Sequence, residues 1–117
     1  VTDQCRRFIA ELEPMTGTQL ATGGIHLGSV DRYRALLHDA LGEHDLADDL
    51  FAAAVEQHEV FRTPPWIART HLDWAESLIA RSQLDDAREH LDAARAAIGY
   101  LDLPDNQRRL DALVSRL

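Results

Sequence analysis

Lysine is absent from this chain of 117 residues, and all twelve of its basic residues are arginine. A phosphate-binding P-loop needs a lysine directly before its serine or threonine. The glycine-rich stretch TGTQLATGGIHLGS (16–29) is therefore not predicted to hold a nucleotide. We interpret it as a connection in which Gly23 and Gly24 form a turn, while Gly24 and Gly28 permit a tight approach before the first helix pair.

Cysteine occurs once, as Cys5, so no internal disulfide can form. The first residues, VTDQCRRFIAELEP, are charged and lack the layout of a signal peptide. No apolar run reaches the eighteen residues or so that a transmembrane helix needs. These features predict a cytoplasmic protein that does not enter the membrane. Because the chain does not begin with Met, we expect it to be a fragment of a larger protein.

Patterns for catalysis and metal binding are also missing. The net charge of −8 opposes a nucleic-acid-binding face. The acidic run GEHDLADD (42–49) lacks the ligand spacing of a calcium loop, and predicts a turn followed by the first turn of a helix. No nucleophile lies in a recognisable motif. The histidines do not have zinc-site spacing; they are His26, His38, His44, His58, His71 and His90. We therefore expect no enzyme activity, no cofactor and no metal.

What the chain does contain is an internal repeat. When the sequence is shifted by forty residues, identical residues coincide at matching points of a helix–turn–helix pattern. The pairs are Ala35 and Ala75, Ala40 and Ala80, Asp45 and Asp85, Ala47 and Ala87, Ala53 and Ala93, Ala54 and Ala94, and Pro64 and Pro104. The repeat predicts two helix hairpins of similar build.

Apolar spacing and turn residues predict the bounds of the helices. The helices are expected at about 1–13, 29–41, 44–61, 64–82, 84–98 and 104–117. Gly42 is placed as a left-handed C-cap, Thr63 as an N-cap, and Pro64 in a first helical turn. On the leading helix, Cys5, Ile9 and Leu12 should face inward. Trp74 lies on an apolar stripe and is predicted to be core, whereas Trp66 either closes the seam between hairpins or remains partly exposed at a binding surface.

The matched positions resemble those of the tetratricopeptide repeat. That motif has a small residue in its first helix (Ala35, Ala75) and Gly or Ser in its turn (Gly42, Ser82). Its second helix has a pattern of Ala, large residue and Ala, and a proline precedes the next unit. Here that pattern is Ala47–Phe51–Ala54 and Ala87–Leu91–Ala94, with Pro64 and Pro104 following. The chain departs from the motif in its period, which is forty rather than thirty-four, and at Arg34 and His38, where the motif has apolar or aromatic residues.

A narrower resemblance covers residues 28–104. The segments GSVDRYRALLHDALGEHDLADDLFAAAV and TPPWIARTHLDWAESLIARSQLDDAREHLDAARAAIGYLDLP are similar to the helical-repeat region of large bacterial signalling ATPases. These include LuxR-type transcriptional regulators and actinobacterial regulators that carry an adenylate-cyclase domain. The resemblance implies a sensor or interaction arm, with any ATPase, cyclase or DNA-binding activity belonging to other domains of a parent protein.

The predicted fold is all-α, a short right-handed superhelix of antiparallel helix pairs with tetratricopeptide-like repeats and a period of about forty residues. We expect one domain over 1–117. It comprises a leading helix and connection (1–27), repeat one (28–62), repeat two (63–103) and a capping helix (104–117).

The resemblance also implies a concave groove lined by the first helix of each pair. The groove-facing candidates are Ser29, Arg32, Leu36, Asp39, Arg69, Leu72, Glu76 and Ile79, with Trp66 as a surface anchor. Arg32 and Arg69 could bind a carboxylate, or could be solvated or paired with nearby acidic residues. The expected function is non-catalytic binding of a protein, a peptide or neighbouring domains of the parent. The alternative is a sensor that binds a small molecule in the groove. The oligomeric state is left open.

Overall fold

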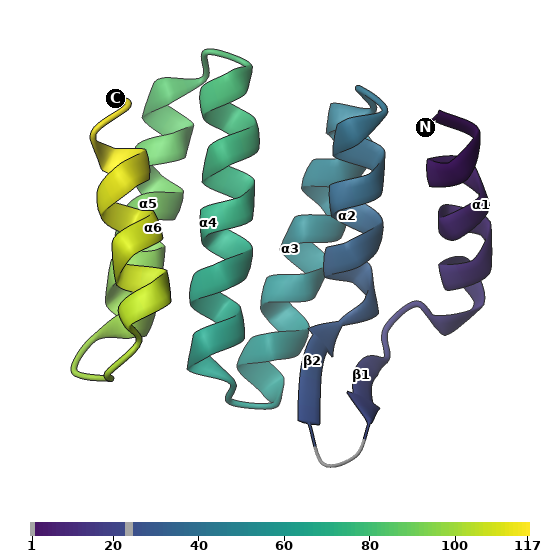
Figure 1. The fold of residues 1–117 in the computed structure, drawn as a ribbon, viewed down its shortest axis with the longest axis horizontal. Coiled ribbons are helices and arrows are strands. Elements are labelled where there is room, and N and C mark those ends of the chain that lie inside the picture. The colour runs from purple at the N-terminus through teal and green to yellow at the C-terminus, as the bar shows by residue number, and fades with distance from the viewer. Residues whose placement is uncertain (1, 23–24) are drawn as a thin grey trace. The chain divides into compact units, whose positions relative to one another are not determined.

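The computed structural model describes residues 2–22 and 25–117, and in this part of the chain helices dominate (Figure 1). The elements are α1 (Thr2–Leu12), a 3-10 turn (Glu13–Met15), β1 (Gln19–Thr22), β2 (Ile25–Ser29), α2 (Val30–Ala40), α3 (His44–Val60), α4 (Pro64–Ala80), α5 (Leu84–Ile98) and α6 (Pro104–Val114). The prediction that the chain is mainly α-helical is confirmed.

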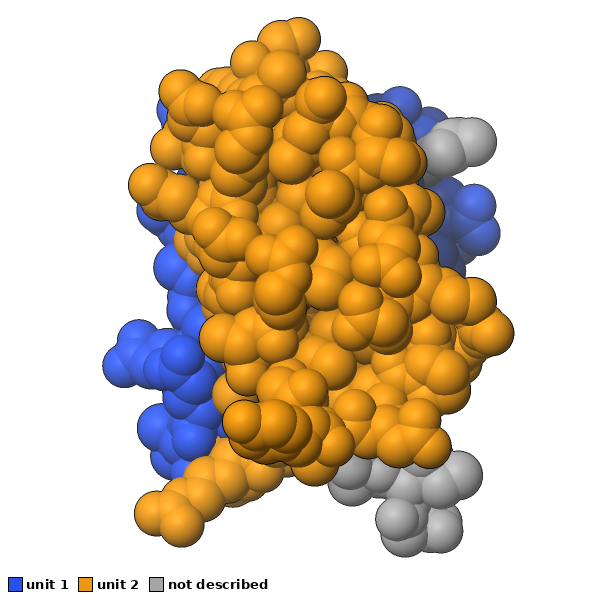
Figure 2. Space-filling model, turned by 90° about the vertical axis from the view of Figure 1, so that its left-hand side faces the viewer, with its two compact units in different colours: residues 1–60 blue, residues 61–117 orange. Residues whose placement is uncertain are grey.

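The chain divides into two compact units, Val1–Val60 and Phe61–Leu117, drawn in blue and orange in Figure 2. In unit 1, α2 packs against α3 and α1 packs against α2. The half-buried residues of α1 are Cys5, Ile9 and Leu12, as their spacing predicted. None of the α1 residues is fully buried, so this helix is less enclosed than α2 and α3.

In unit 2, α4 packs against α5, and α6 lies against both. The three helices share one apolar core. Its buried residues are Ala68, Leu72, Ala75, Leu91, Ala94, Ile98, Leu110 and Leu113. Trp74 lies outside this set and is half-buried, so the prediction that Trp74 is core was only partly right.

Most of the identical residues matched by the forty-residue shift are buried to the same degree in the two hairpins. Ala35 and Ala75, Ala47 and Ala87, and Ala54 and Ala94 all have no exposed surface. The larger pair, Phe51 and Leu91, is likewise enclosed. Ala40 and Ala80 are both exposed, as are Asp45 and Asp85. The α2–α3 and α4–α5 hairpins therefore bury alanines and one large side chain at matching positions.

A short β-hairpin before α2 was not predicted. β1 and β2 pair antiparallel, with Gln19 opposite Ser29 and Thr22 opposite Ile25. Strands of four and five residues give too short a pattern to show the alternation of apolar and polar residues. Gly28 has a φ of +88°, a conformation that glycine adopts readily and other residues do not. The predicted turn at Gly23 and Gly24 lies outside the described residues.

The first helix of each hairpin ends in the same cap. After α2, Gly42 donates its N–H to the Asp39 carbonyl and Glu43 donates to that of His38, both at 3.0 Å. After α4, Ser82 donates to Ile79 and Gln83 to Leu78, at 3.0 and 2.9 Å. This is the Schellman motif, which requires a left-handed residue. Gly42 and Ser82 supply it, with φ of +79° and +61°.

Because Ser82 holds a conformation suited to glycine, Ser82→Gly is expected to stabilise unit 2 by about 0.5–1 kcal/mol. Gly42→Ser should cost unit 1 a similar amount. A Cβ at Gly42 would meet nothing within 4 Å, so only backbone strain would oppose it. Urea unfolding checks both variants, followed by circular dichroism for Gly42→Ser and by tryptophan fluorescence for Ser82→Gly. Both tryptophans, Trp66 and Trp74, belong to unit 2, so their fluorescence reports that unit alone. An unchanged midpoint in both variants would contradict the shared cap.

Candidate functional site

The residues predicted to line a groove differ widely in their exposure to solvent. Ser29 is fully buried at the N-cap of α2, and its hydroxyl accepts the N–H of Asp31 at 3.1 Å. Leu72 is fully buried in the core of unit 2. Arg32 is 5% exposed, and its guanidinium lies 5.2 Å from the centre of the Tyr33 ring. These three side chains therefore offer a ligand little or no surface, because neighbouring side chains enclose them.

The remaining candidates lie in different settings. Leu36 is half-buried and lines an apolar pocket between α1 and α2. Asp39 is half-buried and bonds to His44 Nδ1 at 3.0 Å. Glu76 is exposed and accepts a hydrogen bond from Arg109, while Ile79 packs against the core of unit 2. Arg69 is exposed and remains a candidate for binding.

The interior of unit 1 contains a polar network centred on Asp31, whose surface is only 1% exposed. Its carboxylate accepts hydrogen bonds from the Gly17 N–H at 3.3 Å and from Gln57 Nε2 at 2.7 Å. It also accepts one from Arg34 at 3.3 Å. Arg34 bonds in addition to the hydroxyl of Thr16. Asp31 thus joins the segment before β1 to both α2 and α3, a role that the sequence did not reveal.

The same network holds a serine and a histidine, yet they do not form a nucleophile–base pair. His58 is fully buried, and its Nε2 accepts the backbone N–H of Ser29 at 2.8 Å. The Ser29 hydroxyl donates to Gln57 instead of His58. Since Nε2 is already an acceptor for an amide, it cannot take the hydroxyl proton. The contacts assign Ser29 and His58 a structural role.

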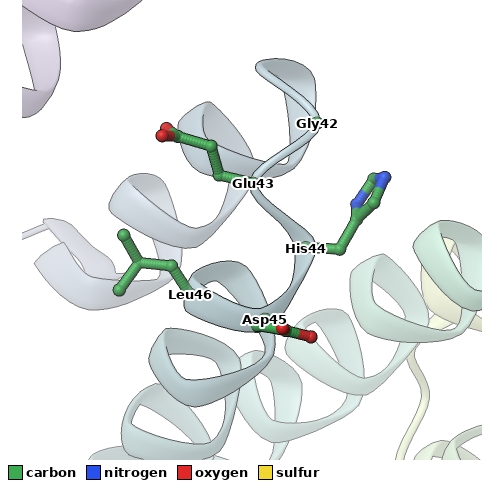
Figure 3. A pocket seen from close by; sticks show the side chains of 5 residues that line it. All are labelled: Gly42, Glu43, His44, Asp45 and Leu46. Carbon is green, nitrogen blue, oxygen red and sulfur yellow. The ribbon is translucent and has the colours of Figure 1, made fainter.

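The turn between α2 and α3 carries two histidine–carboxylate pairs. His38 bonds to Glu43 through Nδ1 at 3.0 Å, as His44 does to Asp39. A hollow of about 440 Å³ beside this turn is lined by residues 42–46. Figure 3 shows the Glu43 and His44 side chains pointing away from one another. Among the described residues, no three His, Cys, Asp or Glu side chains gather as metal ligands.

His38 has a buried nitrogen without a partner. The residue is 6% exposed, and its Nε2 has no hydrogen-bond partner within the described part of the chain. The matched residue of the second hairpin is Leu78, which is 3% exposed. Burying an unsatisfied polar atom costs about 1–3 kcal/mol. His38 therefore weakens unit 1 at a point where the second hairpin has an apolar side chain.

Accordingly, His38→Leu is expected to stabilise unit 1 by about 1 kcal/mol, since the orphaned nitrogen is removed and the bond to the partly exposed Glu43 is weak. Urea unfolding followed by circular dichroism, with tryptophan fluorescence reporting unit 2 separately, measures the change. Leu78→His is the reciprocal variant and should destabilise unit 2. A loss of stability in His38→Leu would show that the hydrogen bond between His38 and Glu43 stabilises unit 1 by more than the unsatisfied Nε2 destabilises it.

Unit 2 holds a cluster of three rings on α4 and α5. The Nδ1 atoms of His71 and His90 are 3.0 Å apart, and Trp74 stacks on His90 with 3.9 Å between ring centres. The centres of the two imidazoles are 5.2 Å apart, and their two Nδ1 atoms are within hydrogen-bond distance. Among the described residues, no third His, Cys, Asp or Glu side chain joins this pair as a metal ligand.

Burial, followed by the nearby His90, lowers the pKa of His71 from 6.5 to about 4. Because the folded pKa lies below the unfolded one, stability is full above pH 6.5 and is lost as the pH falls towards 4. We expect the protonation of His71 to lower the free energy of unfolding of unit 2 by about 1–2 kcal/mol, after allowance for the partial exposure of this residue. Urea midpoints by tryptophan fluorescence between pH 7.5 and 4.5 test this. His71→Asn should flatten the dependence of the urea midpoint on pH, whereas His44→Gln in unit 1 should not. If the midpoint changed equally with pH in the wild type and in His71→Asn, the expected role of His71 would be wrong.

A buried ion pair joins α4 to α6. Arg109 contacts Asp73 at 2.7 Å through Nη1 and Glu76 at 2.8 Å through Nη2. The Asp73 side chain is 4% exposed and that of Glu76 is 51% exposed. Burial acts to lower the pKa of Arg109, but the charges and hydrogen bonds of the two carboxylates outweigh it and raise that pKa. Arg109 is thereby held in its charged form and fixes α6 against α4.

Trp66 and Arg69 meet at the start of α4. The Arg69 guanidinium lies 5.3 Å from the centre of the Trp66 ring. Together with Pro65 and Asn106 they line a hollow of about 160 Å³. A second hollow of about 220 Å³ shares Arg69 and Asn106 and extends along the segment 102–106. Asn106 is fixed by a 3.4 Å hydrogen bond from its Nδ2 to the Pro65 carbonyl. Two predicted candidates, Trp66 and Arg69, are thus brought together with a residue of α6.

Known protein families, curated proteins and solved structures offer no match to this chain. Within the described residues, none of the helices combines the length and the apolar character needed to cross a bilayer. A function for this chain is therefore argued from its own residues and their contacts.

Proposed function

We propose that the chain is a non-catalytic protein-interaction module of a larger bacterial signalling or transcription-regulating protein. In this proposal its hairpins are tetratricopeptide-like repeats of a right-handed superhelix, of the kind found in LuxR-type and adenylate-cyclase-related regulators. The matched burial of Ala35 and Ala75, and of Ala47 and Ala87, supports a repeat. The shared caps at Gly42 and Ser82 support it further.

The observation that carries a binding function is the surface formed by Trp66, Arg69 and Asn106. Tryptophan and arginine are the residues most enriched where binding energy concentrates in protein interfaces. Arg69 is exposed, and it has no carboxylate within salt-bridge distance in the described part of the chain. Its stacking on Trp66 holds the guanidinium in place, so less side-chain freedom is lost on binding.

The hydrogen-bond donors and acceptors around Trp66 indicate the chemistry of a partner that this surface would bind. Arg69 offers a fork of N–H donors to a carboxylate or a carbonyl group. Asp102 and Asp105 line the adjoining hollow and would accept backbone or side-chain N–H donors. An extended protein segment supplies acceptors and donors side by side. We therefore propose a peptide segment with an acidic residue as the ligand, with Trp66 packing against its stem.

Selection from a displayed peptide library on the intact chain tests this proposal. Peptides that bind the wild-type chain should lose at least about tenfold in affinity in Trp66→Ala and in Arg69→Ala. The control is Arg95→Ala, because Arg95 is also exposed but is paired with Asp92 on α5. Circular dichroism establishes that the variants fold. Absence of any enriched peptide, or equal binding by Arg69→Ala and Arg95→Ala, would reject the proposed surface.

A further inference from the structure

Unit 1 contains an apolar pocket of about 410 Å³ between α1 and α2, separate from the Trp66–Arg69 surface. This volume is within the range of sites that hold small organic molecules, roughly 300–1,000 Å³. The pocket is lined by Phe8, Glu11, Leu12, Tyr33, Leu36 and Leu37. Five of these six side chains present carbon surface, and one presents a charge.

The side chains of the protein leave this pocket open. Phe8 is 43% exposed although it lies beside three leucines, and α1 has no fully buried residue. Leu36 and Leu37 are only half-buried. An apolar molecule in the pocket would remove this surface from water, at a gain of about 25 cal/mol for each Å² covered. It would also fix α1 against α2.

The charge in the pocket identifies the head group of the ligand. Glu11 is exposed and has no ion-pair partner among the described residues. It lies three residues after Phe8, so both side chains lie on neighbouring turns of α1. A cation beside them would meet a carboxylate and the face of an aromatic ring, and both interactions favour it.

The length of the pocket argues against a helix as its occupant. A bound amphipathic helix needs anchors over at least two turns of its own length. On α1 the lining runs only from Phe8 to Leu12, which is little more than one turn. We therefore infer that this pocket binds a small amphiphilic amine, with its apolar body among Phe8, Leu36 and Leu37 and its ammonium group at Glu11. This site is independent of the interaction surface on unit 2 and would make unit 1 a sensor of such molecules.

Three probes with one apolar body and different head groups test the inference. They are 4-phenylbutylamine, 4-phenylbutan-1-ol and 4-phenylbutyrate, each titrated calorimetrically into the intact chain. The amine should bind at least about tenfold more tightly than the carboxylate, with the alcohol between them. Glu11→Gln should reduce this preference to within about twofold. Asp3→Asn, which removes another exposed carboxylate of α1, should leave it unchanged.

A second measurement places the ligand in the pocket. Arg6 and Arg7 are exposed on α1, and the chain has no lysine, so trypsin cleaves this helix only at these two residues. The amine should slow this cleavage several-fold in the wild type and not in Leu37→Trp, which fills the pocket. Equal affinity for the three probes, or cleavage that the amine does not slow, would overturn the inference. Concentration-dependent dimerisation abolished by Leu37→Trp would also overturn it, because a second copy would then be the occupant.

Discussion

Asp31→Ala is expected to destabilise unit 1 by about 3–4 kcal/mol. The carboxylate is 1% exposed and accepts three hydrogen bonds, from Gly17, Arg34 and Gln57. Removing it leaves two neutral donors and one guanidinium without this acceptor in a partly buried setting. Each unsatisfied neutral donor costs about 1–3 kcal/mol, and water entering the cavity recovers part of this.

The measurement is urea unfolding followed by circular dichroism at 222 nm. Tryptophan fluorescence follows unit 2, which holds both tryptophans, while circular dichroism follows the helices of both units. Asp49→Ala is the control, because Asp49 is an exposed aspartate of α3 and should change stability by less than about 0.5 kcal/mol. Similar midpoints for Asp31→Ala and Asp49→Ala would show that the buried network contributes little to the stability of unit 1.

The helix bounds could be predicted because their signals are local. Pro64 and Pro104 begin α4 and α6, and Gly99 follows the last residue of α5 with a φ of +49°. Thr63 is the N-cap residue, although its side chain makes no capping hydrogen bond. The half-buried face of α1 follows from apolar spacing alone. Each of these features depends on residues within one or two turns of each other.

The polar contacts could not be predicted, because they join residues far apart in the chain. Gln57 and Asp31 are 26 positions apart, and Arg109 and Glu76 are 33 apart. No local pattern specifies such pairs, and an acidic or basic residue on a helix is usually exposed. One signal was present in the sequence. Arg34 and His38 depart from the tetratricopeptide pattern, and these two residues contain the buried nitrogens without partners, Arg34 Nε and His38 Nε2.

The candidate site could likewise be predicted only in part from the sequence. The resemblance placed eight residues along a groove, but sequence position alone could not tell which side chains are enclosed. Leu72 fills the core and Ser29 caps α2, whereas Arg69 and Trp66 remain accessible because they begin α4 beside α6. Asn106 was missed because the capping helix was expected only to cover the end of the stack.

Arg109→Ala is expected to destabilise unit 2 by about 2–3 kcal/mol. Loss of the guanidinium would remove the cation beside the buried Asp73 carboxylate, at 2.7 Å, and the contact that joins α6 to α4. The estimate is below the range for fully buried pairs because the Arg109 side chain is 32% exposed and water screens part of its charge. Glu76→Gln should cost less than about 0.5 kcal/mol, since Glu76 is half exposed.

Arg108 provides a matched control one position away. Its side chain is 74% exposed and pairs with Asp105 on the same helix, so Arg108→Ala should change stability by less than about 0.5 kcal/mol. Urea unfolding followed by the fluorescence of Trp66 and Trp74 reports unit 2 in all three variants. The double variant Asp73→Ala/Arg109→Ala should be more stable than the sum of the single losses predicts, because the buried charge is then removed with its partner. Strict additivity, or equal losses in Arg108→Ala and Arg109→Ala, would mean that α6 is held to α4 by its leucines alone.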